Sequence, residues 1–183
     1  MRPVASKDLP DLPEDSTCDG ESLYLDDAER AVVGAGDRQV LAVRTSHEGE
    51  PDLETDATWD LKPYVAYGDC LVSVAPDWSG RIWWASYEGK VGMLDTVEGG
   101  AKVLELDERI TQPFSVDESG VFLTTEKAVY RLVVDAGGSA AISWRTEYDR
   151  GVEVKSGQTV QGSGSGPVLV DGNLVAIADN AEP

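Results

Sequence analysis

Histidine is nearly missing from this chain, and cysteine is scarce. The single histidine, His47, excludes any metal site built on two histidines, and two cysteines cannot form a four-cysteine zinc site or a disulfide-rich scaffold. Cys18 and Cys70 either pair with each other or remain two ordinary thiols, and we expect thiols, with Cys70 buried beside a strand. His47 follows Ser46 in a polar loop, and no nucleophile elbow is present, so we expect a surface histidine instead of a catalytic triad.

Positive charge is scarce as well. The 183 residues include 15 Lys and Arg against 34 Asp and Glu, which gives a net charge of −19. Such a surface repels phosphate backbones and anionic membranes, so we expect neither a nucleic-acid partner nor a membrane partner. The acidity reflects either a high-salt habitat or an ordinary acidic protein, and we favour the second interpretation.

Long apolar runs are also absent. No segment approaches the roughly 20 apolar residues that a transmembrane helix needs. Residues 1–20 contain three prolines and four aspartates where a secretory signal peptide would carry an apolar run. The sequence therefore predicts a soluble protein without an export signal, cytoplasmic by default, whose residues 1–19 form a flexible, acidic, proline-rich tail.

Helical periodicity is nearly absent, and short alternating or β-branched runs take its place. These runs are separated by Gly, Asp, Asn and Pro, which is typical of an all-β sandwich, barrel or propeller. The predicted strands are 21–25, 30–34, 38–44, 70–75, 81–86, 90–95, 101–106, 113–117, 120–125, 128–134, 140–145, 167–171 and 173–178.

An internal repeat indicates which all-β fold this is. Two turns of similar sequence, Asp-Trp-Ser-Gly at 77–80 and Asp-Glu-Ser-Gly at 117–120, begin 40 residues apart. A period near 40 with four strands per unit is typical of a β-propeller blade. The sequence thus predicts an all-β propeller with about four blades of four antiparallel strands, near 20–60, 66–110, 111–150 and, in part, 165–183.

The number of blades predicts an incomplete ring. A ring of six to eight blades needs roughly 240 residues or more at this period, and a small ring of four is the alternative that we consider weaker. An incomplete propeller exposes sheet faces and strand edges. We therefore expect either self-association or a partner segment that completes the ring.

The stretch PDWSGRIWWASYEGKVGMLDTVEGG at 76–100 resembles a blade of the quinoprotein-like (PQQ-like) β-propellers and of the related gluconolactonase-like propellers. The stretch 144–183 is similar to a segment of uncharacterised bacterial members of that superfamily, and the resemblance covers about residues 66–183. Quinoprotein dehydrogenases hold PQQ between a tryptophan and a disulfide of adjacent cysteines. Cys18 and Cys70 are far apart in the sequence, so PQQ is not expected here.

Three tryptophans lie close together in the repeat. On a strand, Ile82 and Trp84 share one face, whereas Trp83 and Ala85 share the other. Trp78 and its neighbours form either an aromatic wall for a sugar or flat ligand, with Trp84 as the binding residue, or packing between blades. We favour packing, because interfaces between sheets are commonly filled by large aromatic side chains.

The lactonase-like resemblance implies a hard cation such as Ca²⁺ in the central channel. Asp179 and Asn180, after the last predicted strand, are the candidate ligands, and a simple turn pair is the alternative. Glu147 and Asp149 follow another strand and are the catalytic candidates. Calcium is the one cofactor for which the sequence offers candidate ligands.

The glycine-rich segment 157–167 lacks the lysine and the following helix of a phosphate-binding loop, so we expect an inter-blade loop. Gln158, Gln161 and Ser163 would supply neutral polar ligand contacts at the channel mouth. Arg150 either binds a ligand carboxylate or pairs with Asp149 or Glu147.

The sequence favours a non-catalytic β-propeller module that binds or scaffolds an unknown ligand, as part of a larger or self-assembled propeller. The alternative is a Ca²⁺-dependent lactonase-like or sugar-oxidising enzyme with its site in the central channel. A gene fragment without a function of its own is the third alternative.

Overall fold

The computed structural model describes residues 4–12, 22–46, 49–171 and 174–181. These residues form 14 β-strands and no helix, so the predicted all-β class is confirmed. No helix in the described part of the chain is long and apolar enough to cross a membrane. His47 and Cys18 lie outside the described residues.

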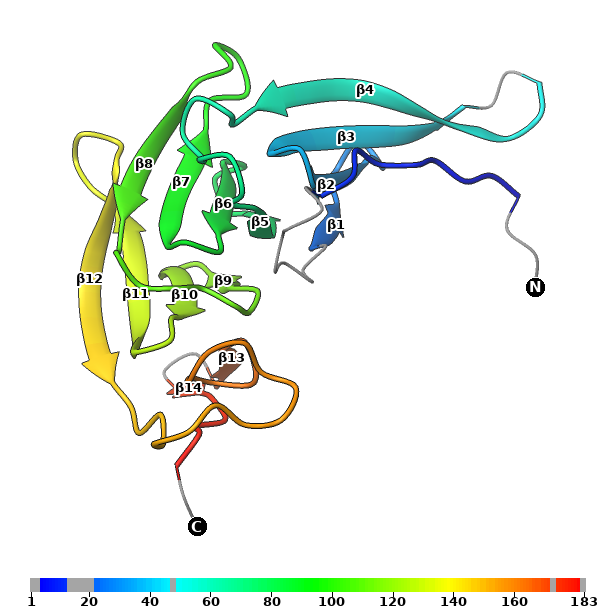
Figure 1. Cartoon of the computed structure of the whole chain (residues 1–183). Helices are drawn as coiled ribbons and strands as arrows, with labels where there is room; N and C mark the ends of the chain where they lie inside the picture. The colour runs from blue at the N-terminus through cyan, green and yellow to red at the C-terminus, as the bar shows by residue number, and fades with distance from the viewer. Residues whose placement is uncertain (1–3, 13–21, 47–48, 172–173, 182–183) are drawn as a thin grey trace.

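The strands form three four-stranded antiparallel sheets and one two-stranded ribbon, each built from consecutive strands (Figure 1). Sheet 1 contains β1 (Leu23–Leu25), β2 (Ala31–Ala35), β3 (Gln39–Ser46) and β4 (Asp52–Asp60). Sheet 2 contains β5 (Leu71–Pro76), β6 (Ile82–Ser86), β7 (Lys90–Leu94) and β8 (Ala101–Glu105). Sheet 3 contains β9 (Ser115–Asp117), β10 (Gly120–Thr124), β11 (Ala128–Val134) and β12 (Ala140–Glu147), and the ribbon contains β13 (Val168–Val170) and β14 (Leu174–Ala176).

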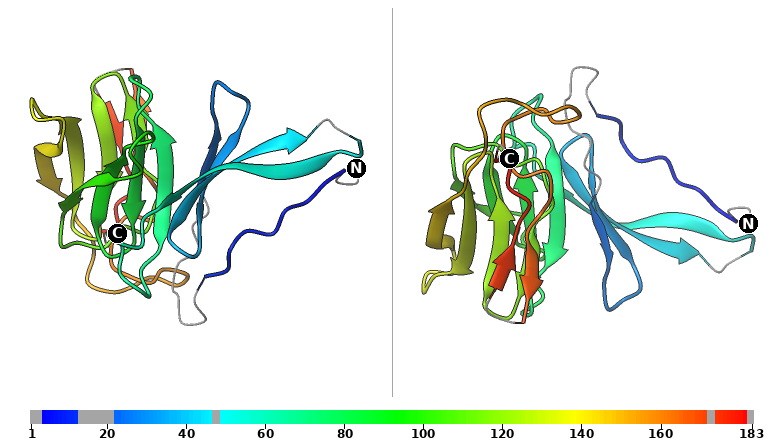
Figure 2. Two further views of the ribbon diagram at one scale, coloured as in Figure 1. Left: turned by 90° about the horizontal axis from the view of Figure 1, so that it is seen from above. Right: turned by 90° about the horizontal axis from the view of Figure 1, so that it is seen from below.

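The sheets follow one another around an arc, in the manner of blades (Figure 1). The first strands of successive sheets contact one another in the series β1, β5, β9 and β13. The arc is open between β13 and β1, and the β3–β4 hairpin projects away from the other sheets in all three views (Figures 1 and 2). The first strands therefore line the inside of the arc, while β4, β8 and β12 lie on its outside.

Two apolar clusters fill the spaces between the sheets. One lies between sheets 1 and 2 and contains Ile82 and Trp84, and the other lies between sheets 2 and 3 and contains Trp83 and Ala85. The alternation predicted for this strand is confirmed. Strand β6 thus supplies one tryptophan to each cluster, because neighbouring residues of a strand point to opposite faces.

The packing of Trp84 requires a glycine on the adjacent strand. Gly92 is the register partner of Trp84 in the pairing of β6 with β7. A Cβ atom at Gly92 would lie 2.5 Å from a ring carbon of Trp84, which is far inside van der Waals contact. Glycine has no Cβ atom, so it is the residue at position 92 that leaves room for the indole of Trp84.

A third, smaller cluster covers the other face of sheet 1. It contains Val33, Leu41 and Val43, and Leu9 of the N-terminal segment packs against it. The carbonyl oxygen of Pro10 also accepts a hydrogen bond from the amide of Gly36 at 3.1 Å. Residues 9–12 of the expected flexible tail are thus held against sheet 1.

One strand was not predicted from the sequence. Strand β4 pairs with β3 over its whole length, from Asp52 opposite Ser46 to Asp60 opposite Gln39. Its sequence, DLETDATWD, carries six acidic or threonine residues at exposed positions and only Trp59 is buried. An edge strand with both faces largely in solvent needs no apolar alternation, so the pattern that revealed the other strands is missing here.

The expectation of two free thiols is wrong for Cys70. Cys70 is buried just before β5, as expected, but it is disulfide-bonded. The only other cysteine in the sequence is Cys18. A cross-link of this kind stabilises a protein mainly by restricting its unfolded chain.

Reduction of this disulfide is expected to lower the free energy of unfolding by about 2–4 kcal/mol. The measurement is a denaturant unfolding curve with and without a thiol reductant. The Cys70→Ala variant is the control, because reductant should leave its midpoint unchanged. An equal midpoint for oxidised and reduced wild-type protein would contradict the expectation.

Candidate functional site

An aspartate begins the turn between the first two strands of each four-stranded sheet. Oδ1 of Asp26 accepts hydrogen bonds from the amides of Ala28 and Arg30 at 3.0 and 2.8 Å. Asp77 does the same with Ser79 and Arg81 at 2.8 and 3.1 Å, and Asp117 with Ser119 and Gly120 at 2.6 and 3.1 Å. These side chains take the place of backbone acceptors in tight turns, so the repeat in the sequence is a repeat of one turn geometry.

A groove of about 380 Å³ lies between the turns of sheets 2 and 3. Trp78 is 72% exposed at this groove. Trp83, which also lines it, is buried and donates its indole N–H to Oδ2 of Asp77 at 3.0 Å. Four carboxylates face a single arginine among the lining residues, which include Asp77, Arg81, Asp117, Glu118 and Asp135.

Asp77 is the best-connected carboxylate in this groove. Its Oδ2 also accepts a hydrogen bond from Nε of Arg81 at 2.6 Å, and its side chain is 10% exposed. Burial alone would raise the pKa of Asp77. Hydrogen bonds from Trp83, Arg81 and the turn amides outweigh burial and hold the pKa below 3.8. Asp77 is therefore ionised at neutral pH, and a general base with such a low pKa would be a poor one.

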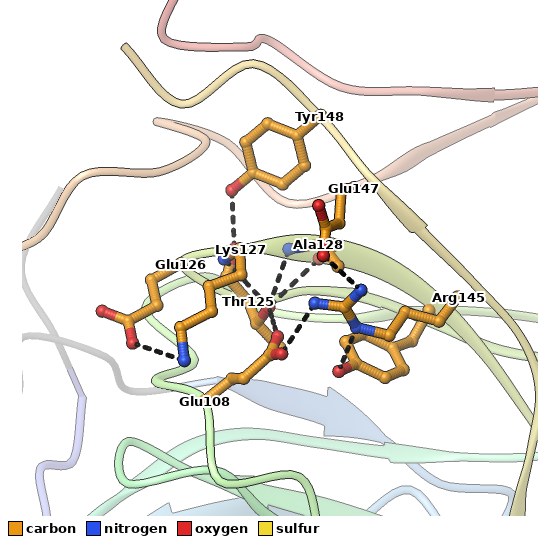
Figure 3. A network of polar contacts seen from close by, with 9 residues as sticks. Glu108, Thr125, Glu126, Lys127, Ala128, Arg145, Glu147 and Tyr148 are labelled. Carbon is orange, nitrogen blue, oxygen red and sulfur yellow. Dashed lines mark hydrogen bonds and ion pairs between the residues drawn. The ribbon is translucent and has the colours of Figure 1, made fainter. Parts of the chain in front are cut away.

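A second polar cluster lies at the connection between sheets 2 and 3 (Figure 3). Glu108 precedes sheet 3, and its side chain is 10% exposed. Oε2 of Glu108 accepts a hydrogen bond from Oγ1 of Thr125 at 2.6 Å, and its Oε1 accepts one from Nη2 of Arg145 at 2.9 Å. Glu108 thus joins the connection to both β12 and the β10–β11 turn.

Arg145 has a partner for each of its three nitrogens. Nη1 pairs with Glu147 at 2.9 Å, Nη2 pairs with Glu108, and Nε donates to the hydroxyl of Tyr130 at 2.9 Å. Burial would raise the pKa of Glu108, but the hydrogen bonds from Thr125 and Arg145 hold it below its ordinary value of 4.5. Each guanidinium nitrogen is engaged by a protein group, so this cluster holds the segments together.

Tyr148 extends this cluster to the long connection that follows β12. Its hydroxyl donates to the carbonyl oxygen of Thr125 at 2.6 Å and accepts a hydrogen bond from the amide of Ser163 at 2.7 Å. Burial raises the pKa of Tyr148, so the phenol stays protonated and keeps the donor role. Ser163, an expected polar contact at the channel mouth, is buried at this point.

The two catalytic candidates have ordinary structural partners. Glu147 is the exposed partner of Arg145, with 75% of its side chain accessible. Asp149 is exposed, and its Oδ1 accepts a hydrogen bond from the amide of Gly151 at 2.9 Å. The expected ion pair of Arg150 with either carboxylate is not among the salt bridges of the described residues.

The structure brings three of the predicted residues, Asp149, Arg150 and Asn180, together at one place. The side-chain amide of Asn180 is buried and donates to the carbonyl oxygens of Arg150 and Glu153 at 3.2 and 3.4 Å. The amide of Asn180 also donates to the carbonyl oxygen of Asp149 at 3.2 Å. Asp179 is exposed and accepts a hydrogen bond from the amide of Ala181 at 3.4 Å. Asn180 thus fixes the loop at 149–153.

The two glutamines differ in their surroundings. Nε2 of Gln161 donates to the carbonyl oxygen of Val152 at 2.6 Å, so Gln161 holds the same loop as Asn180. Oε1 of Gln158 is buried and accepts no hydrogen bond in the described part of the chain. Trp84, the predicted ligand-stacking residue, is completely buried between sheets 1 and 2. The packing interpretation of Trp84 therefore fits its position.

The described ranges contain no metal site of the usual kind. Among the residues placed, no group of three or more His, Cys, Asp or Glu side chains is arranged to hold a metal ion. No family model and no curated protein matches the sequence. The resemblance to PQQ-like propellers consequently rests on the residues at 76–100 and 144–183 alone.

Replacing Asp77 by Asn is expected to lower the free energy of unfolding by about 1–3 kcal/mol at neutral pH, because Trp83 and Arg81 lose a charged acceptor. The effect should diminish as the pH falls through the lowered pKa of Asp77, where the wild-type carboxylate is itself protonated. Asp117→Asn is the matched control, since an amide oxygen can serve its turn amides. Equal destabilisation by the two variants in chemical denaturation would contradict the prediction.

Glu108→Gln should destabilise the protein by about 1–3 kcal/mol, because it removes a nearly buried charged acceptor from Arg145 and Thr125. Glu147→Gln affects the same guanidinium at an exposed position and should cost less than about 0.5 kcal/mol. Unfolding curves between pH 7 and pH 3 provide the measurement. Because the pKa of Glu108 is below 4.5 in the folded state, the difference between wild type and Glu108→Gln should disappear as the pH falls through that lowered pKa.

Proposed function

We propose that this chain is a non-catalytic β-propeller module that binds or scaffolds other molecules, as part of a larger or self-assembled propeller. The observation that carries the proposal is the series of blade-like sheets around an arc whose two ends expose apolar side chains. Leu23 and Leu25 are 62% and 72% exposed at one end, and Val168 and Leu174 are 58% and 64% exposed at the other. Exposed apolar faces of this kind mark interaction surfaces.

The polar side chains support the same proposal. The best-connected carboxylates, Asp77 and Glu108, have lowered pKa values and hold turns and connections. The catalytic candidates Glu147 and Asp149 are exposed and bonded to neighbours on their own segment. A ligand would most readily meet the groove between sheets 2 and 3, where Trp78 offers an exposed aromatic face beside hydrogen-bonding groups.

The Ca²⁺-dependent enzyme with its site at Asp179 and Asn180 is the competing function. The side-chain nitrogen of Asn180 is engaged with the backbone of 150–153, and Asp179 lies exposed beside it. No observation on the described residues favours this function over the scaffold. Evidence for this Ca²⁺-dependent activity would overturn the proposal.

The test combines unfolding and turnover. Metal-stripped protein should show the same unfolding midpoint with and without millimolar Ca²⁺, because a ligand that binds only the folded state would raise it. The same preparation should not hydrolyse lactones or oxidise sugars. A midpoint that rises with Ca²⁺, together with turnover that Asp179→Asn removes and Asp171→Asn preserves, would overturn the proposal.

A further inference from the structure

We propose that two copies of this chain join head to tail and close one ring. The exposed face of the ribbon in each copy would pack against the exposed end of β1 in the other. We call the first surface the ribbon face (Val168, Val170 and Leu174) and the second the β1 face (Leu23 and Leu25). The inference rests on the proposed scaffold function and names its partner, which is a second copy of the chain.

The β1 face is an exposed apolar part of sheet 1. Burial alternates along β1, with Tyr24 packed into the cluster between sheets 1 and 2 and its two neighbours exposed. On the same side of the sheet, Val33 and Leu41 are buried beneath the segment that contains Leu9. Among the described residues, 9–12 lie against the part of this face at β2 and β3, while Leu23 and Leu25 at β1 stay exposed. A partner could therefore dock at β1 without displacing residues 9–12.

The ribbon face is the uncovered part at the other end of the arc. Burial alternates along both strands of the ribbon, and Val170 is paired with Leu174. Leu169 and Val175 are half-buried, and they line a groove of about 210 Å³ with Phe122 and Trp144 of sheet 3. The alternate residues have no cover among the described residues: Val168 and Leu174 are more than half exposed, and Val170 is 39% exposed.

The packing between sheets within one copy indicates that the partner is a second copy of the chain. Sheets 1 and 2, and sheets 2 and 3, pack face to face through apolar clusters, and the first strands contact one another in the series β1, β5, β9, β13. Continuing that series beyond β13 requires a first strand of the same kind, and β1 is the strand whose preceding neighbour is absent in the described part. The two ends flank the open side of the arc (Figure 1).

The distribution of charge also favours a second copy of the chain over a basic partner protein. The net charge of the chain is −19, yet residues 162–178 contain one charged residue, Asp171, and residues 22–25 contain none. Contact between the ribbon face and the β1 face therefore brings apolar surfaces together without placing like charges opposite each other. The two bodies still repel at longer range, so salt should strengthen the association by screening.

The symmetry of the contact makes the proposal specific. A head-to-tail contact uses two different surfaces, and it closes into a ring with twofold symmetry when the second contact repeats the first. Each copy then contributes one ribbon face and one β1 face, and both contacts are identical. A substitution that disrupts either face is present in both copies, so it disrupts both contacts.

The experiment is sedimentation equilibrium of the full chain over a range of protein concentration and salt. Wild type should be a dimer whose dissociation constant falls as salt rises. The variants L23D/L25D and V168D/L174D should each raise the dissociation constant by at least about tenfold, because each places charges in an apolar contact. V97D is the matched control, since Val97 is 90% exposed in the β7–β8 turn and outside both faces.

Mixing the two double variants distinguishes head-to-tail from other contacts. A mixture of L23D/L25D with V168D/L174D retains one contact between undamaged faces, so it should form mixed dimers more readily than either variant alone. An isologous contact between two β1 faces would leave V168D/L174D dimeric by itself and would overturn the proposal. Circular dichroism and unfolding midpoints equal to wild type verify that the exposed substitutions leave the fold intact.

A monomeric wild-type chain at all salt concentrations would also overturn the dimer. An open filament that grows with concentration would contradict ring closure, because it would show that the head-to-tail rotation does not return to its start. Neither result tests turnover or Ca²⁺ binding. Failure of the dimer is thus separable from failure of the non-catalytic function.

Discussion

Burial of the sheet faces against neighbouring sheets is the constraint on which the whole molecule depends. Sheet 2 has a neighbour on each side, and every residue of its second strand, β6, is buried. Trp83 and Trp84, which are adjacent in the sequence, consequently belong to two different apolar clusters. At the ends of the arc, the first strand β1 and both ribbon strands, β13 and β14, have a packed neighbour on one side only, and burial alternates along them.

The polar groups secure connections that apolar burial does not specify. Aspartates close the turns of the sheets by accepting backbone amides, and Glu108 and Tyr148 attach segments that are distant in the sequence. Because hydrogen bonds to buried or half-buried groups are costly to leave unmade, these side chains have little freedom for chemistry. The groove at Trp78 and the apolar ends of the arc are among the surfaces that stay exposed.

Some elements carry a local sequence signal and others do not, for identifiable physical reasons. Thirteen predicted strands overlap observed ones, because apolar alternation and Asp or Gly turns are local signals. Strand β4 lacked that signal, since only one of its nine residues is buried. The role of Glu108 had no signal at all, because its partners Thr125 and Arg145 lie 17 and 37 residues further along the chain.

By itself, the sequence determined the period of the repeat, the alternation that separates Trp83 from Trp84, and the aspartates that begin the turns. Each of these depends on residues within a few positions of one another, where the pleat of a strand and the geometry of a turn dictate the conformation. Only the tertiary structure decided that Asn180 holds the loop at 149–153, that Cys70 is disulfide-bonded and which faces stay exposed. Those outcomes depend on how whole sheets pack, which brings together segments that no local pattern connects.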